Sequence, residues 1–337
     1  MVTKPDDRLK LVSTVIEQKY AIDRVLREDD FFVDYDATQL IVNRRVVVRV
    51  FVGLAEVEGH ARSLLCNDFL ADQAKLAELA STAPALRAIR DAGTLPLPGG
   101  GWLPFVIEES SSGESLAADL NERRLAHIAY TLPDAVHALD GIAGGLAIAH
   151  DIGLVHGRVA QDDVWVLDSG IVLRNFGLSR LAARARELNG IPIASSSAPD
   201  STPSSQLSSP QHDVFGLASL LVQMCGPSPA GMNAAASAVL ARALNAAPMK
   251  GWRDAGEFWN ALRSALALPV MRSLTKTIPP DVTGASAPTS LHRTRLLIMS
   301  LTLLLVGIAV GVLRTSCMPE SSQHGVGQDG VRDRQSP

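Results

Sequence analysis

The spacing of apolar residues divides the chain into two structural parts. Residues 37–51, ATQLIVNRRVVVRVF, hold two β-rich runs joined by a polar Asn-Arg turn, and residues 101–109 form another strand-like run. Between them, residues 69–80 carry apolar side chains at helical spacing. After a leader at 1–19, residues 20–112 are therefore predicted to form a sheet with one helix.

After Gly113 the apolar period lengthens and predicts helices. Residues 133–153 form an amphipathic helix that a glycine ends, and residues 213–226, 234–245 and 255–267 repeat the helical pattern. Residues 268–290 are rich in proline, serine and threonine without periodicity, which is typical of a linker. The pattern predicts a mainly helical part at 113–267 and a flexible linker at 268–295.

Residues 296–313 are an uncharged apolar run bracketed by Arg295 and Arg314. As a helix the run spans about 27 Å, close to the hydrocarbon thickness of a bilayer. We expect one transmembrane helix here and a short polar tail at 314–337. The first ten residues are charged and have no apolar core, so no secretory signal is expected and the preceding domain is predicted to be cytoplasmic. Gly307 and Gly311 form a G-x-x-x-G spacing that would allow a homodimer.

Composition and charge narrow the classes of function. The chain has 337 residues, of which 47% are hydrophobic, and this supports a packed core. A net charge of -4 gives no general attraction to nucleic acid, so any partner must be recognised locally. The three cysteines are widely separated, which favours reduced residues and indicates neither a disulfide framework nor a metal site.

Several short motifs follow one another along the chain. LREDDFFVDY at 26–35 precedes VVVR at 46–49, HGRVAQDD at 156–163 precedes RNFG at 174–177, and APD and HDVFG follow at 198–200 and 212–216. Over residues 20–266 this series resembles the protein kinase superfamily, especially bacterial serine/threonine receptor kinases. The resemblance implies an α+β, two-lobed protein-kinase-like fold with a small β-rich N-lobe at 20–112 and a larger helical C-lobe at 113–267, plus the C-terminal transmembrane helix.

The first of these motifs departs from the family pattern. In the family, three glycines let this hairpin fold over the phosphates of ATP. Arg27, Asp29 and Phe32 stand at those positions here, so carboxylates would face an anionic ligand and a phenyl ring would fill phosphate space. We therefore expect a surface hairpin that binds phosphate poorly.

Arg49 stands where the family has its phosphate-binding lysine. Arginine keeps the charge, but its forked head is larger and differs in geometry. The resemblance implies a partner on the following helix, either Gln73 or Asp72. A pair with Asp72 would be exposed and contribute about 0 to 1 kcal/mol.

The catalytic motifs have lost their reactive groups. The resemblance puts Arg158 at the catalytic base, Ala160 at the lysine, Asp163 at the metal-binding asparagine and Asn175 at the metal-binding aspartate. Arg158 cannot accept a proton from a substrate hydroxyl, because guanidinium has no acceptor. No catalytic residue is expected to be intact. Arg49, Asp163 and Asn175 remain as residual nucleotide positions, and the last two as residual metal ligands, since magnesium accepts carboxylate and amide oxygens.

The scaffold positions of the family are retained. The resemblance implies that His156 braces the loop at 156–163, that Phe176 and Gly177 support packing, and that Asp213 anchors the loop backbone from a buried helix. Asp200 keeps the acid that closes the activation segment.

This contrast predicts a membrane-anchored pseudokinase that needs no cofactor. It would act as a scaffold or allosteric regulator and bind a protein such as an active kinase or its substrate, with the serine-rich segment at 193–211 as a candidate phosphate acceptor. Two alternatives stay open. One is a weakly active serine/threonine kinase that uses Arg49 for phosphate, Asp163 with Asn175 for metal and the nearby Asp162 as base; the other is a module that binds ATP with magnesium and transfers nothing.

Overall fold

The computed structural model describes residues 7–97, 101–110, 112–190, 209–226, 229–244 and 251–269, which all lie in one compact unit, residues 1–274. In these ranges no helix is long and apolar enough to cross a membrane. The expected transmembrane helix at 296–313 and the polar tail at 314–337 lie outside the described residues, as do Asp200 and most of the predicted linker. Those elements stay predictions.

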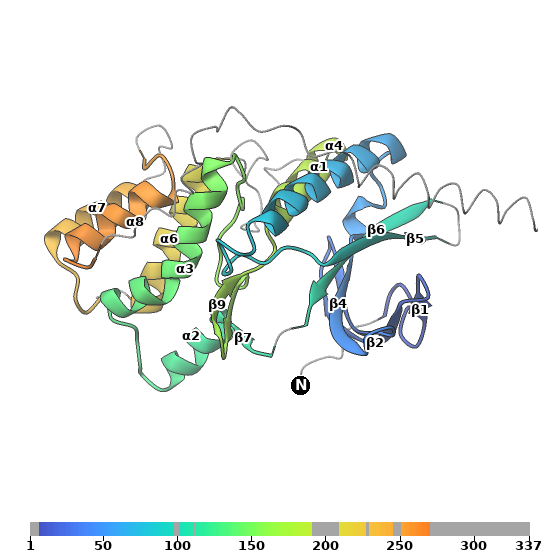
Figure 1. Ribbon diagram of the computed structural model, residues 1–337, viewed down its shortest axis with the longest axis horizontal. Helices are drawn as coiled ribbons and strands as arrows, with labels where there is room; N and C mark the ends of the chain where they lie inside the picture. The colour runs from blue at the N-terminus through green and yellow to red at the C-terminus, as the bar shows by residue number, and fades with distance from the viewer. Residues whose placement is uncertain are drawn as a thin grey trace, which may run out of the picture. The chain divides into compact units, whose positions relative to one another are not determined.

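The small lobe is built on an antiparallel sheet (Figure 1). Among the described residues six strands pair in the order β1-β2-β3-β4-β6-β5: β1 Val15–Ile16, β2 Tyr20–Glu28, β3 Val33–Gln39, β4 Arg44–Val50, β5 Asp91–Pro96 and β6 Trp102–Glu109. β-Branched and aromatic side chains fill one face, where Tyr35, Val48 and Ile107 are fully buried. The register places Asp34 opposite Arg49 and Arg49 opposite Val106, so three neighbouring strands meet at Arg49.

The turn between β3 and β4 differs from the sequence prediction. The apolar run at 37–42 suggested a strand as far as Val42, but β3 ends at Gln39 and the following three apolar residues are exposed. Gln39 pairs with Tyr20 on one side and with Arg44 on the other, so no strand is left to pair with residues 40–42. Asn43 closes the turn with a left-handed φ of 49°.

Residues 7–19 belong to the small lobe, although the sequence suggested a separate leader at 1–19. β1 pairs with β2, and Leu9, Leu11 and Val12 pack against the core of the sheet. The Tyr35 hydroxyl donates to Asp7 at 3.0 Å. These contacts extend the folded lobe toward the N-terminus.

Helix α1 (Gly59–Glu78) covers the sheet after a short 3-10 turn, η1 (Val52–Leu54), and includes the predicted helical segment at 69–80 except for its last two residues. Glu58 caps it by accepting from the backbone N–H groups of His60 and Ala61. The cap lowers the pKa of Glu58, because both backbone hydrogen bonds favour the carboxylate. Leu65, Phe69 and Leu76 form the buried face of the helix.

The large lobe is mainly helical, as predicted (Figure 1). Its described elements are β7 Glu114–Ser115, α2 Leu116–Leu125, α3 Leu132–Asp151, β8 Val164–Leu167, β9 Gly170–Leu173, α4 Leu178–Leu188, α6 Pro210–Cys225, α7 Ala234–Leu244 and α8 Ala255–Ala265. Helix α3 lies at the centre and contacts α6, α8 and β9. The sequence predicted α3, α6, α7 and α8 but neither α2 nor α4.

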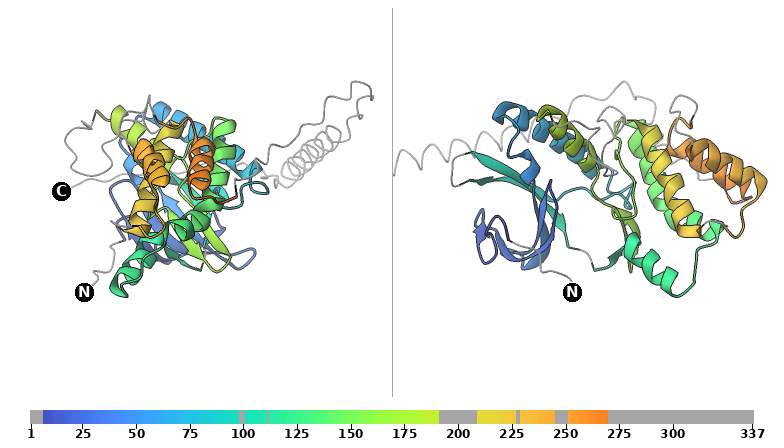
Figure 2. Two further views of the ribbon diagram at one scale, coloured as in Figure 1. Left: turned by 90° about the vertical axis from the view of Figure 1, so that its left-hand side faces the viewer. Right: turned by 180° about the vertical axis from the view of Figure 1, so that it is seen from behind.

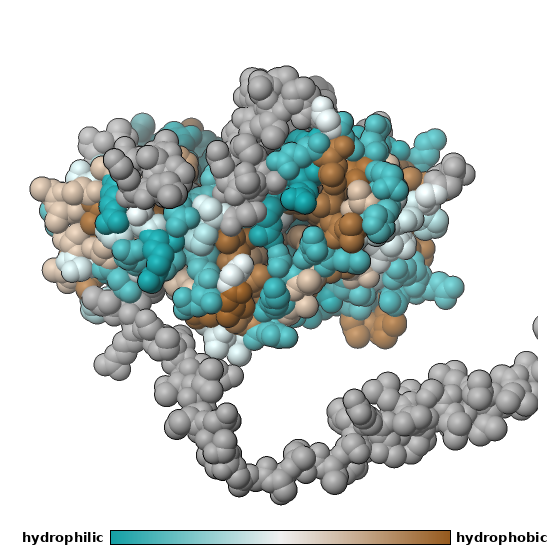
Figure 3. Space-filling model, turned by 90° about the horizontal axis from the view of Figure 1, so that it is seen from above, coloured by the Kyte–Doolittle hydropathy of each residue, from teal (hydrophilic) through white to brown (hydrophobic). Residues whose placement is uncertain are grey.

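Helix α4 follows Gly177 directly and lies beside α1 in all three ribbon views (Figure 2). Its apolar residues join one cluster with Phe31, Phe51 and Phe69, which come from the first hairpin, the end of β4 and α1. The face in Figure 3 is mostly hydrophilic, with hydrophobic side chains gathered in separate patches. α4 thus ties the large lobe to the small lobe next to the cleft.

Candidate functional site

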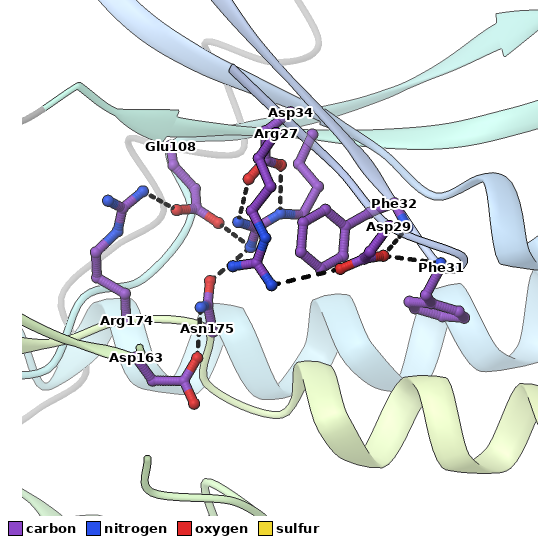
Figure 4. Close-up of polar contacts among 10 residues, drawn as sticks. Arg27, Asp29, Phe31, Phe32, Asp34, Glu108, Asp163, Arg174 and Asn175 are labelled. Atoms are coloured by element: carbon purple, nitrogen blue, oxygen red, sulfur yellow. Dashed lines mark hydrogen bonds and ion pairs between the residues drawn. The ribbon is translucent and has the colours of Figure 1, made fainter. Parts of the chain in front are cut away.

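Arg49 is the centre of the cleft and is almost fully buried, with 4% of its surface exposed. Its Nε and Nη2 donate to the two carboxylate oxygens of Asp34 at 2.7 and 2.8 Å. Its Nη1 donates to Glu108 at 2.8 Å and to the amide oxygen of Asn175 at 2.6 Å. Figure 4 shows Asp34, Glu108 and Asn175 converging on this one guanidinium.

The expected partners of Arg49 on α1 are engaged elsewhere, so the predicted Arg49 pair with Gln73 or Asp72 is wrong. Asp72 pairs with Arg180 of α4. Gln73 donates to the backbone oxygen of Phe176 at 2.7 Å and accepts from the Ile89 N–H. The reason lies in the register of the sheet, which sets the carboxylates of β3 and β6 nearer to the guanidinium than α1.

Glu108, at the end of β6, joins two buried cations. One carboxylate oxygen accepts from Arg49 and the other from Nη2 of Arg174 at 2.5 Å. Burial opposes ionisation of Glu108, yet Arg49 and Arg174 together hold its pKa below the ordinary range. Burial alone would lower the pKa of Arg49, but Asp34 and Glu108 raise it overall. Both groups are therefore charged.

The first hairpin folds inward onto this network. Phe32 is 6% exposed, and its ring centroid lies 4.3 Å from the Arg49 guanidinium carbon, a cation–π contact. The Asp29 carboxylate accepts from the backbone N–H groups of Phe31 and Phe32, both at 2.8 Å, and fixes the tip. The guanidinium carbon of Arg27 lies 5.1 Å from the centroid of the same ring (Figure 4). The hairpin expected at the surface instead buries both phenyl rings.

Helix α6 anchors the backbone of the loop at 156–163. Asp213 is fully buried and accepts from the backbone N–H groups of His156 and Gly157, both at 2.8 Å, and from Nε2 of His150 at 3.0 Å. A Cβ on Gly216 of α6 would lie 2.6 Å from the Val159 carbonyl oxygen, so only glycine permits this approach. This is the backbone anchor that the family resemblance implies for Asp213.

His156 links this loop to the strand that ends at Arg174. Its Nε2 lies 2.8 Å from the Arg174 carbonyl oxygen, and its ring meets the Phe176 ring edge to face at 5.3 Å. The imidazole is buried and contacts main chain and an aromatic ring, which fits the bracing role that the resemblance implies. Gly177 follows with a left-handed φ of 75°, which lets the chain turn into α4.

Asp163 and Asn175 contact each other directly. The Asn175 amide nitrogen donates to Oδ1 of Asp163 at 2.6 Å, while its oxygen accepts from Arg49. The opposite amide orientation would set an NH2 group against the guanidinium, so the contacts fix this one. Burial raises the pKa of Asp163, although His156, Asn175 and two arginines oppose the rise.

The remaining positions predicted from the sequence lie in the same loop. Arg158 is half-buried and its backbone N–H donates to Nδ1 of His156 at 3.3 Å. Ala160 is half-buried and Asp162 is exposed. Arg158 therefore lies in this loop two residues after His156, and Asp162 has no described contact with the Arg49 network.

These residues do not fit a magnesium-bound nucleotide. The Asn175 oxygen faces a guanidinium, and its NH2 group faces the one carboxylate that remains, so an ion would meet a cation and a donor. Among the described residues no group of three or more histidine, cysteine, aspartate or glutamate side chains could hold a metal ion. The Phe32 ring covers the free face of Arg49.

Sequence reasoning missed three residues of the network, Asp34, Glu108 and Arg174. Each is a charged residue next to an apolar strand run, as in FFVDYDA, LPFVIEE and GIVLRN. A charge at such a position can be buried, and a buried charge needs a partner. The pattern is compatible with buried ion pairs, but it does not say which residues form them.

Known protein kinases are similar to this chain in part of its sequence or in fold. No protein-family model matches the sequence. The chain is 26% identical over 172 residues to the probable serine/threonine-protein kinase pknA2 of Bifidobacterium longum, and the match covers 51% of this chain and 21% of that protein. The chain therefore matches about a fifth of the length of this curated relative.

Solved kinase structures share the fold. The PknI kinase domain of Mycobacterium tuberculosis has a TM-score of 0.51 at 18% identity, covering 77% of this chain and all of that one (100%). The apo form of PpkA-294 has a TM-score of 0.55 at 16% identity, covering 74% and 98%. The chain is thus similar to a probable serine/threonine-protein kinase over about half of its length, and its folded unit has a kinase-like fold.

Proposed function

We propose that the folded unit is a pseudokinase, which binds a protein partner and does not transfer phosphate. One observation carries the proposal: the arginine at the phosphate-binding position is buried in contacts with the protein itself. Four hydrogen bonds occupy Arg49, and two of its partners are carboxylates. A guanidinium has five N–H donors, so little capacity is left for a phosphate.

The energetic barrier to nucleotide binding has three parts. A triphosphate would have to displace the Phe32 ring from Arg49. It would also have to replace Asp34 and Glu108, and leaving one partner of a buried ion pair alone costs about 3 to 5 kcal/mol. Finally, the displaced carboxylates would repel the phosphates at close range.

A nucleotide titration of the full-length chain tests this proposal. Thermal unfolding would be followed with ATP and magnesium or manganese. A ligand at a hundred times its Kd would stabilise the protein by about 2.7 kcal/mol, and we expect no such shift. A matched variant, Phe32→Gly, removes the ring that covers Arg49. It is also expected to show no shift, because Asp34 and Glu108 still occupy the guanidinium.

A phosphotransfer assay separates the two alternatives. Radiolabelled ATP and a generic protein substrate would be incubated with the wild type and with Asp163→Ala. No transfer is expected from either protein. Transfer by the wild type that Asp163→Ala abolishes would establish a working kinase, whereas a nucleotide shift without transfer would establish an ATP-sensing module.

The weakly active kinase is supported by the name of the sequence relative, a probable serine/threonine-protein kinase. Asp163 also remains in the cleft, 2.6 Å from the Asn175 amide. For this pair to hold a metal, the amide would have to rotate and release Arg49. The double variant Arg158→Asp with Asn175→Asp supplies the carboxylates the family uses, and gain of transfer by it would show that the lobes can still close on ATP.

We also propose that residues 296–313 anchor the unit to a membrane as a single span, with the kinase-like unit in the cytoplasm. The support is the uncharged eighteen-residue run itself. Fractionation of cells that express the full chain should put it in the membrane pellet, and a chain ending at residue 295 should move to the supernatant. Equal distribution of the two chains would reject the anchor.

A further inference from the structure

A partly enclosed cavity of about 140 Å³ lies behind the Arg49 network. Its walls come from α1, from β6, from residues 86–90 and from residues 174–178. The volume is close to that of an engineered cavity of about 150 Å³ that binds benzene. The exposed residues Ala77 of α1 and Ala80, just after the end of α1, stand at its rim, so the cavity opens to solvent on that side.

The inner walls of the cavity are apolar. Phe51, Phe69, Leu86 and Val106 line it and are all buried. Such a surface favours a flat apolar body, because aromatic rings can stack or meet edge to face with Phe51 and Phe69. The shape and lining fit a single aromatic ring better than a long or polar molecule.

The charged residues that line the cavity carry an excess of positive charge. Four are arginines, at positions 49, 87, 90 and 174, and two are glutamates, at positions 108 and 109. Glu108 is bound by Arg49 and Arg174, and Glu109 accepts from Arg90 at 2.5 Å and pairs with Arg44. The pKa of Glu109 lies below its ordinary value, chiefly through the hydrogen bond from Arg90. A net positive lining favours an anion.

Arg87 is the arginine of this set whose side chain has an unsatisfied donor. Its Nε atom is buried and has no hydrogen-bond partner among the described residues. Its backbone N–H donates to the Leu173 carbonyl oxygen, so the main chain holds the residue at the cavity. Arg87 also makes no described hydrogen bond or salt bridge through its side chain, so the outer nitrogens of its guanidinium can bind an acceptor on a ligand in the cavity.

We propose that this cavity binds a compact aromatic carboxylate, with the ring between Phe69 and Val106 and the carboxylate on Arg87. The fork of an arginine matches a carboxylate with two parallel hydrogen bonds, which gives both affinity and orientation. The cavity shares Arg49 and Asn175 with the residual nucleotide positions, but its proposed ligand is not a nucleotide and the proposal does not depend on the pseudokinase proposal. Because Arg49, Glu108 and Arg174 form one wall, a bound ligand would contact the cleft network directly.

Benzoate is the probe that tests the site, with the full-length chain and no nucleotide present. Ligand-observed NMR or calorimetry should show saturable binding. Neutral benzyl alcohol, of nearly the same shape, should bind about tenfold more weakly, because a hydrogen bond to a charged group contributes about 1.5 to 3 kcal/mol. The variant Arg87→Gln should lose the same factor for benzoate and leave benzyl alcohol unchanged.

A second variant tests the position of the ring. Ala77→Leu places a larger side chain at the rim and should weaken both probes. Ala74→Leu, one turn earlier on the exposed side of α1 and away from the cavity, should change neither. Thermal unfolding of each variant checks that it folds.

Three results would overturn the proposal. The first is the absence of saturable benzoate binding up to about 10 mM, the weakest Kd expected for a ligand of about nine heavy atoms. The second is equal affinity of benzoate and benzyl alcohol in the wild type, which would leave only an apolar cavity. The third is unchanged benzoate affinity in both Arg87→Gln and Ala77→Leu.

Discussion

The two sides of the cleft are stabilised by different kinds of contact. On the large-lobe side, Asp213 and His156 still fix the loop at 156–163 through main-chain contacts. On the small-lobe side, Arg49 is enclosed by Asp34 and Glu108. The first set supports backbone geometry, which every copy of the fold needs. The second set occupies the hydrogen-bonding groups of Arg49, and under the proposed function these groups are then not available to a phosphate.

This difference distinguishes contacts that stabilise the fold from groups that would bind a ligand. A buried aspartate that binds backbone N–H groups stabilises the loop whether or not a substrate arrives. A phosphate-binding cation must instead be left partly unsatisfied until its ligand binds, and such a group is costly to bury. In this chain Asp34 and Glu108 pair with Arg49, so the cost of burying an unpaired cation does not arise. The comparison predicts that mutation on either side lowers the stability of the protein, but through the loss of different interactions.

The largest effect is expected at Glu108. Glu108→Ala would leave Arg49 and Arg174 with one carboxylate fewer, and breaking a buried ion pair costs about 3 to 5 kcal/mol. Glu109 is the matched control, because it is the next residue and also pairs with two arginines, but these pairs are partly exposed. Glu109→Ala should cost about 0 to 1 kcal/mol in urea unfolding. Equal costs would mean that burial does not distinguish the two sets of pairs.

The next largest effect is expected on the large-lobe side. Asp213→Ala removes the acceptor for His150, His156 and Gly157, and each buried donor left unpaired costs about 1 to 3 kcal/mol. Relaxation of the loop toward water should hold the total near about 3 kcal/mol. Asp162→Ala, at an exposed position of the same loop, should stay within about 0.5 kcal/mol. Chemical denaturation of both variants provides the measurement, and a small loss for Asp213→Ala would reject its anchoring role.

The sequence was sufficient for the elements whose pattern is local. Helices α3 and α8 repeat apolar residues at helical spacing, and β6 is a strand run bounded by glycines and serines. Helix α4 was missed because its apolar stripe is made largely of alanines between arginines. α2 was missed because its ten residues include only three leucines.

The cleft network could not be read from the sequence. Arg49 is 15 residues from Asp34, 59 from Glu108 and 126 from Asn175. These contacts depend on strand register and on the position of one lobe against the other, and neither follows from local spacing. The family resemblance located Arg49, Asp163 and Asn175 but pointed to the wrong partner for Arg49, since in the family that partner lies on the helix. The charged residues beside the apolar strand runs are compatible with buried pairs but do not identify them.

A smaller effect is expected from the ring that covers Arg49. A double-mutant cycle of Phe32→Leu and Arg49→Gln measures their coupling, because the cycle cancels the separate costs of each change. A desolvated cation–π contact should give about 0.5 to 2 kcal/mol. Phe31 is the control, since its ring packs on Phe51 at 6.0 Å, and its coupling to Arg49 should be near zero. Equal coupling for the two rings would place the stabilisation in general packing.

The smallest effect is a pH dependence that comes from Asp163. Burial raises the pKa of this carboxyl above its unfolded value, so the folded protein binds the proton more tightly than the unfolded chain. Asp163 therefore adds stability below its unfolded pKa, near about 4, and this stability is lost as the pH rises through the folded pKa. The variant Asp163→Asn keeps an oxygen acceptor for the Asn175 amide and cannot titrate.

The difference in unfolding free energy between wild type and Asp163→Asn should therefore change with pH in that window and become constant above it. The wild type should gain relative to the variant as the pH falls. Asp162→Asn, at an exposed position of the same loop, is the control for the removal of a carboxylate as such. A difference that changes in the opposite direction would mean that the nearby cations outweigh burial at Asp163. The carboxylate would then be held as an ion, as a metal ligand must be, and the two sides of the cleft would be less different than their contacts imply.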